Sequence, residues 1–180
     1  MSPHLVLVGL MGTGKSTVAR QLANRLQRPA VDTDHLVEQR TGRTVREIFE
    51  ADGEEAFRDV EESVLADALS DPRPSVLAAA GGSILRESNR RLMKDCELVI
   101  WLDASIDLLV HRTRHRGPGG HRPLLDSDPR TRLASLKIER ESLYREVSDE
   151  RIEVDGMSVV EVVDLAARLH SAAIGLARPS

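Results

Sequence analysis

Short apolar runs alternate along the chain with longer stretches in which apolar residues recur every three or four positions. The runs are apolar on both faces, as expected for strands of a parallel sheet that helices cover on both sides. Their alternation with helical patterns is typical of βαβ units. The runs expected to be strands are His4–Val8, Ala30–Val31, Val76–Ala79, Leu98–Leu102 and Ile152–Val154. The pattern therefore predicts an α/β fold, a three-layer α/β/α domain with a five-stranded parallel sheet.

Helical spacing of apolar residues predicts the segments between the strands. In Lys15–Leu26, Val18, Leu22 and Leu26 share one face. Thr44 is a candidate N-cap for a short helix, and a longer helix is expected at Glu54–Leu69. The remaining predicted helices are Ile106–His115, Pro129–Arg145 and Val159–Leu169. Because no internal repeat or long linker interrupts this order, residues 1–180 are expected to form a single domain.

Composition narrows the choice of partner and compartment. Hydrophobic residues make up 41% of the 180 residues and charged residues 30%, which is ordinary for a soluble globular protein. A net charge of −4 and the lack of any apolar segment long enough to span a bilayer predict neither nucleic acid nor a membrane as partner. The single cysteine, Cys96, has no intramolecular partner, which favours a reducing cytoplasm. Its place before a strand favours a buried, inert thiol over a catalytic one.

Residues 9–16, GLMGTGKS, match the pattern G-x-x-x-x-G-K-[ST] between a predicted strand and a predicted helix. Glycines such as Gly12 and Gly14 allow the backbone N–H groups to point at phosphate oxygens, and the helix N-terminus adds partial positive charge. Lys15 would supply a mobile charge for the β- and γ-phosphates, and the Ser16 hydroxyl could ligate Mg²⁺. The alternative is an ordinary glycine-rich turn. The motif in this context predicts binding of ATP or another nucleoside triphosphate.

Two carboxylates, Asp32 and Asp34, follow the second predicted strand. Ligands of open α/β sheets bind at the carboxyl ends of strands, where these residues are expected. If the segment is extended, alternate residues share a face, so one carboxylate could hold Mg²⁺ while the other accepts a proton from a hydroxyl group. An aspartate turn that caps the next helix is the alternative interpretation.

Arginines provide candidates for binding anions. Arg58 lies in an acidic helix start and could bind a carboxylate through two parallel hydrogen bonds, or could form a surface ion pair with Glu54, Glu61 or Glu62. Residues 111–122 contain four arginines and three histidines around a Gly-Pro-Gly-Gly tract. This composition favours a mobile lid that closes over polyphosphate, although a solvated basic loop is the alternative.

Taken together, these segments resemble the shikimate kinase family over most of the chain, from Leu5 to about Ala166. The matching residues are GLMGTGKST at 9–17, DTD at 32–34, GEEAFR at 53–58, GG at 81–82, RPLL at 122–125 and ER-x-x-LY at 139–144. The resemblance implies a P-loop kinase fold of the nucleoside-monophosphate-kinase type. It implies ATP-dependent phosphorylation of the 3-hydroxyl of shikimate, a step of aromatic amino acid biosynthesis, with Mg²⁺. We also expect a monomer.

The resemblance also implies roles for individual residues. Mg²⁺ would be held by Ser16, with Asp32 nearby. Catalysis would fall to Lys15, Asp34 and Arg122. ATP would be bound by Gly12, Thr13, Gly14, Lys15, Ser16, Thr17, Arg112 and Arg122. Shikimate would be bound by Asp34, Phe49, Phe57, Arg58, Gly81, Gly82 and Arg140. The lid would span about residues 112–125.

Two departures from the family pattern concern the pocket. The family usually has three glycines after the third strand, but the first is Ala80 here, and the lid is about three residues longer. We expect Ala80 to be tolerated at a negative φ, because the pocket needs a lack of bulk at Gly81 and Gly82, and we expect Gly81→Ala to do much more harm than Ala80→Gly. The alternative functions are a kinase for another polyol acid or cyclitol, and a nucleotide-binding module without catalysis.

Overall fold

The computed structural model describes residues 2–114 and 128–176. Five parallel strands form one sheet in the order β2-β3-β1-β4-β5. Their bounds are β1 Ser2–Val8, β2 Ala30–Asp32, β3 Val76–Ala78, β4 Cys96–Asp103 and β5 Glu150–Glu153. The prediction of a five-stranded parallel sheet is confirmed, with strand ends shifted by one or two residues.

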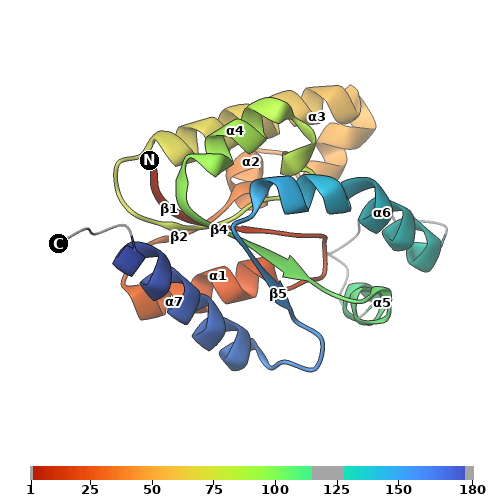
Figure 1. Cartoon of the computed structure of the whole chain (residues 1–180). Helices are drawn as coiled ribbons and strands as arrows, with labels where there is room; N and C mark the ends of the chain where they lie inside the picture. The colour runs from red at the N-terminus through yellow and green to blue at the C-terminus, as the bar shows by residue number, and fades with distance from the viewer. Residues whose placement is uncertain (1, 115–127, 177–180) are drawn as a thin grey trace.

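Helices cover both faces of the sheet (Figure 1), which gives the predicted three layers. The helices are α1 Lys15–Leu26, α2 Thr33–Thr41, α3 Val45–Ser70, α4 Glu87–Lys94, α5 Ile106–Arg114, α6 Pro129–Val147 and α7 Val159–Leu176, with a 3₁₀ turn, η1, at Ser83–Leu85. Helices α1 and α7 lie on one side, and α3, α4 and α6 on the other. Among the described residues, no helix is both long and apolar enough to cross a membrane.

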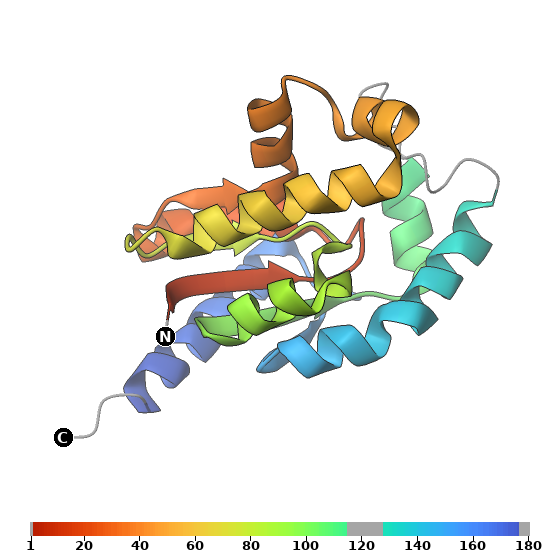
Figure 2. The same cartoon turned by 90° about the horizontal axis from the view of Figure 1, so that it is seen from above.

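Two helices were not predicted from the sequence. Helix α2 buries only Thr33 and Val37, and α4 buries only Asn89 and Met93. Half of each buried pair is polar, so neither helix carries the apolar stripe on which prediction by periodicity depends. The two helices predicted around Gly53 form one element with a break, because Gly53 has φ 86° and ψ 175°. Figure 2 shows that α3 changes direction along its length.

Two hydrophobic clusters hold these elements. The main cluster lies on the sheet, where Leu5 and Ile100 are fully buried, and the Trp101 ring stacks on Tyr144 with 5.7 Å between centroids. The smaller cluster lies between α2 and α3 and is formed by Val37, Ile48, Phe57 and Val64. Apolar burial of this kind is the main stabilising term in folding. The α2–α3 pair thus has its own packing beside the carboxyl end of the sheet.

Candidate active site

The phosphate-loop residues connect β1 to α1, as predicted. Gly12 and Gly14 have φ values of 88° and 100°, in the left-handed region that favours glycine. Lys15 Nζ donates hydrogen bonds to the carbonyls of Gly9 at 2.7 Å and Leu10 at 3.0 Å. Buried Thr13 donates from its hydroxyl to Leu10 O at 2.9 Å. The loop therefore has a defined curl with a lysine ammonium held against it at the N-terminus of a helix.

A pocket of about 360 Å³ opens beside this loop. Its lining residues are Gly12, Thr13, Gly14, Thr17, Val18, His111, Arg112, Val154, Met157, Val159 and Val162. Arg112 donates to Thr13 O at 3.1 Å, which places its guanidinium against the loop at the edge of this pocket. Val154, Met157, Val159 and Val162 were missed, because they follow β5 and only the sheet brings its carboxyl end to the same edge. An apolar wall next to a phosphate loop fits a flat nucleotide base.

Ser16 and Asp32 were predicted to hold Mg²⁺. Ser16 is exposed in the first turn of α1, and Asp32 is half-buried at the end of β2. Within residues 2–114 and 128–176, no group of three or more His, Cys, Asp or Glu side chains could hold a metal ion. The Ser16 hydroxyl and the Asp32 carboxylate fit Mg²⁺, because this ion keeps several waters and binds through one or two protein oxygens and substrate phosphates.

The geometry predicted for Asp32 and Asp34 is wrong in one respect. The segment is not extended, because Asp32 is the N-cap of α2 and accepts a hydrogen bond from Asp34 N at 3.1 Å. Asp34 is exposed and already lies in the first helical turn. The capping alternative therefore describes Asp32, since a short acidic side chain satisfies a free N–H group at the helix start. Both carboxylates still lie at the carboxyl edge of the sheet.

The segment that follows β3, residues 79–86 (the Gly81 segment), lies directly against the phosphate loop. A Cβ built on Gly81 would lie 3.3 Å from Gly9 O and 3.5 Å from Met11 N. The Gly81 carbonyl accepts hydrogen bonds from Tyr144 Oη at 2.6 Å and from an Arg140 guanidinium nitrogen at 3.1 Å. Ala80, whose φ is negative as expected, donates from its N–H to Thr33 Oγ1 at 2.9 Å.

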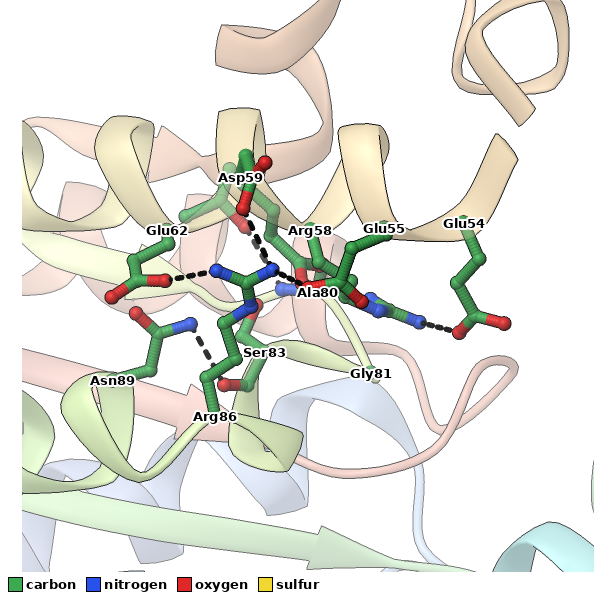
Figure 3. A network of polar contacts seen from close by, with 12 residues as sticks. Glu54, Glu55, Arg58, Asp59, Glu62, Ala80, Gly81, Ser83, Arg86 and Asn89 are labelled. Carbon is green, nitrogen blue, oxygen red and sulfur yellow. Dashed lines mark hydrogen bonds and ion pairs between the residues drawn. The ribbon is translucent and has the colours of Figure 1, made fainter. Parts of the chain in front are cut away.

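Arg58 forms two of the ion pairs considered for it, but the side chain is buried, with 6% of its surface exposed, rather than at the surface. It pairs with buried Glu61 at 2.7 Å and with exposed Glu54 at 3.0 Å (Figure 3). Gly82 packs on the guanidinium so closely that a Cβ would lie 2.3 Å from Nη1 of Arg58. Glu62, the third acid considered for Arg58, pairs with Arg86 instead.

The buried charges near Gly81 leave a surplus of positive charge. Arg140 is 5% exposed and has no carboxylate at ion-pair distance among the described residues, while Glu61 is the buried acid beside Arg58. Burial disfavours the charged form of Arg58, but Glu61 and Glu54 outweigh it and raise the pKa of the guanidinium. Burial also raises the pKa of the Glu61 carboxyl, although Arg58 and Arg140 act against this shift. Two buried cations and one buried carboxylate suit a small anionic ligand.

The remaining predicted residues are placed as follows. Phe57 is buried and Phe49 half-buried, with ring centroids 4.6 Å apart, next to the Arg58 guanidinium. Arg122, the RPLL segment and most of the lid expected at about 112–125 lie outside the described residues. Glu61 was considered as a partner of Arg58, but the contributions of Thr33 and Tyr144 were not predicted, because they depend on partners that only the fold reveals.

Comparison with known proteins decides the family. The family model for shikimate kinase matches residues 11–169. A shikimate kinase from Symbiobacterium thermophilum is 48% identical over 162 residues, which cover 89% of this chain and 91% of the relative. The chain belongs to the shikimate kinase family. Like the family, it is an ATP-dependent kinase that phosphorylates shikimate.

A solved structure agrees with this assignment. The shikimate kinase from Acinetobacter baumannii, solved in complex with shikimate, superposes with a TM-score of 0.88 at 37% identity, covering 94% of this chain and 93% of the other. A second relative in the family, from Chromobacterium violaceum, is 46% identical over 83% of this chain and 79% of its own. The P-loop kinase fold is confirmed, and the polyol-acid and non-catalytic alternatives are not needed.

Proposed function

We propose that this site transfers the γ-phosphate of ATP to the 3-hydroxyl of shikimate, with the donor in the phosphate loop and the acceptor between α3, α6 and the Gly81 segment. The contact between Gly81 and the loop residues Gly9 and Met11 is the observation that carries the proposal. It puts an acceptor bound at Gly81 next to the phosphates held by the loop. Such proximity replaces a bimolecular encounter with a reaction between held partners.

Arg58 and Arg140 would bind the carboxylate of shikimate. Their buried Nε atoms have no hydrogen-bond partner among the described residues, and one anion would balance the surplus charge. Arginine suits a carboxylate because its planar donors match two oxygens at once. Gly82 leaves room for Arg58 at the bottom of this pocket. Phe49 and Phe57 would bound the ring side, and Asp34 would accept the proton of the attacking hydroxyl.

Lys15 would neutralise charge on the β- and γ-phosphates, and Arg122 would reach them from the lid. The N–H groups of residues 12–17 would hold the same oxygens, with the base against Arg112 in the apolar pocket. Ser16 and Asp32 would hold Mg²⁺ near the phosphates, Asp32 through water. When bound, Mg²⁺ lowers the barrier by balancing charge on the transferred group.

The same site bears on the oligomeric state, and the composition bears on other partners and on the compartment. All the residues proposed for ATP and shikimate lie in one chain, so the reaction needs no second copy and a monomer suffices. The net charge of −4 gives nucleic acid no electrostatic reason to bind. A buried, unpaired Cys96 suits the reducing cytoplasm.

Steady-state kinetics of Arg58→Lys tests the acceptor assignment. Lysine keeps the charge but lacks the planar pair of donors, so KM for shikimate should rise by about 10- to 150-fold, which corresponds to about 1.5–3 kcal/mol. KM for ATP should stay within twofold, the usual scatter of such measurements. Arg46→Lys is the matched control, because Arg46 lies on the same helix and makes an exposed pair with Glu50. A larger change for ATP than for shikimate in Arg58→Lys would show that the acceptor is misplaced.

Lys15→Ala tests the donor side in the same assay. It should lower kcat by orders of magnitude at an unchanged circular dichroism spectrum, because Lys15 contacts loop carbonyls rather than the core. Near-normal turnover would contradict its role.

A further inference from the structure

Arg86 joins the Gly81 segment to α3. It directly follows η1, and 25% of its side chain is exposed. Its guanidinium pairs with Glu62 at 2.6 Å, with Asp59 at 2.7 Å and with Glu55. Figure 3 shows the guanidinium among these three acids, beside the Arg58–Glu54 pair. One arginine thus holds three carboxylates of a helix that lies far away in the sequence.

These acids form one of two neighbouring stripes on α3. Residues 54, 58 and 61 share a stripe at helical spacing, and residues 55, 59 and 62 share the next one. The first stripe has its own cation, Arg58, between two acids. The second has acids alone, and like charges three or four residues apart on a helix repel one another. Arg86 supplies the cation that this stripe lacks.

The Gly81 segment meets α3 at two places. Gly82 rests on the Arg58 guanidinium, and four residues later Arg86 binds Glu62. The turn between them is held by α4 instead, since Asn89 donates to Ser83 O at 2.9 Å and Arg90 to Ile84 O at 2.8 Å. Arg86 and Ser88, which both bond to Glu62, fix the far end of the turn relative to the helix that carries Arg58.

We propose that Arg86 is a positioning residue for the acceptor. By holding η1 against α3, it keeps Gly82 at the distance from Arg58 that leaves the guanidinium facing the shikimate carboxylate. The inference rests on the proposed function of Arg58. Isolated surface ion pairs contribute little, but this half-buried guanidinium serves three acids at once, so its loss leaves their repulsion uncompensated.

Steady-state kinetics of Arg86→Gln tests the proposal. KM for shikimate should rise by about three- to tenfold, while KM for ATP stays unchanged, because the phosphate loop makes no contact with Arg86 that the structure records. Arg86→Lys should recover part of the loss by restoring the charge. Arg91→Gln is the control, since Arg91 makes an exposed pair with Glu87 on α4 and should leave both constants unchanged.

A merely structural role would lower the melting temperature or kcat of Arg86→Gln at a normal KM for shikimate, and this result would overturn the proposal. Glu62→Gln provides a second route if Arg86→Gln folds poorly. Glu62→Gln should also raise KM for shikimate. In the double variant, KM for shikimate should rise by less than the product of the two single increases. If Arg58→Lys shifts KM for shikimate but neither Arg86→Gln nor Glu62→Gln does, the positioning role alone fails. If Arg58→Lys has no effect, the proposed function fails instead.

Discussion

At the scale of single residues, the acceptor pocket depends on glycines at positions where a side chain would not fit. Gly82 has a φ of −99°, so its backbone would accept any residue, and what excludes a side chain is the Arg58 guanidinium. That guanidinium cannot easily move away, because Glu61 and Glu54 hold it and the site is buried. A methyl group at Gly82 would therefore act on acceptor binding through Arg58.

We predict that Gly82→Ala raises KM for shikimate by about 10- to 100-fold, the cost expected when a binding group is displaced by about 1 Å. KM for ATP should change far less. From the sequence, a lack of bulk was expected to matter at both Gly81 and Gly82, and the Arg58 contact makes Gly82 the more sensitive of the two for the acceptor. Gly81 has no positive φ, and its Cβ would press on the phosphate loop at 3.3 Å, so Gly81→Ala should affect both substrates mildly.

Ala80→Gly is the control for both glycine variants. It should leave KM for shikimate unchanged and lower stability slightly, because glycine adds freedom to the unfolded chain. Kinetics of the three variants side by side decide the matter. A larger acceptor effect at Gly81 than at Gly82 would mean that Arg58 does not lie under the bound acceptor.

The residues that sequence could and could not identify differ in where their partners lie. The phosphate loop was predictable because its chemistry is contained in eight consecutive residues. Thr44 was predictable as a cap because its partner Glu47 is three residues away. Tyr144 donates to Gly81, 63 positions distant, and Thr33 contacts Ala80, 47 positions distant. Neither contact leaves a local pattern, so only the folded chain could reveal them.

At the scale of elements, α3 combines two segments that contribute different parts of the pocket. The segment before the break at Gly53 carries Phe49, and the segment after it carries Phe57 and Arg58. Gly53 adopts φ 86° and ψ 175°, a combination that is essentially restricted to glycine. The break lets the two phenylalanine rings meet, although they lie in different segments of α3.

We predict that Gly53→Ala lowers the free energy of unfolding by about 1–3 kcal/mol through backbone strain alone. Crowding makes no contribution, because nothing lies within 4 Å of a Cβ built there. Gly175→Ala is the matched control, in open space but in α7 at an ordinary φ, and should stabilise the protein by about 0.5–1 kcal/mol through helix propensity. Urea denaturation measures both. Equal effects of the two substitutions would rule out strain at Gly53.

At the scale of the whole molecule, the sheet order explains why donor and acceptor meet. Strands β2, β3 and β1 are neighbours, and their carboxyl ends lead into Asp32, the Gly81 segment and the phosphate loop. Strand β5 ends on the far side of β4 and contributes the apolar residues of the nucleotide pocket. The sequence predicted the strands but not their order, and without the order the pocket after β5 could not be assigned.

The same fold buries Cys96 at the start of β4, and this burial makes the protein less stable at alkaline pH. Burial, with a smaller contribution from Asp95, raises the pKa of the thiol from 9.0 to about 12. A group whose folded pKa is raised stabilises the fold below its unfolded pKa, and this stability is lost as pH rises from about 9 to 12. At pH 10 the unfolded thiol is mostly ionised and the folded thiol is not.

We predict that the free energy of unfolding falls by about 1 kcal/mol more in the wild type than in Cys96→Ala between pH 8 and pH 10. Tyr144, whose pKa burial also raises, contributes equally to both proteins, so the difference between them isolates the thiol. Urea denaturation at the two pH values measures it. Parallel losses in the two proteins would show that the Cys96 thiol ionises as readily in the folded chain as in the unfolded one, and its burial would then have no influence on alkaline stability.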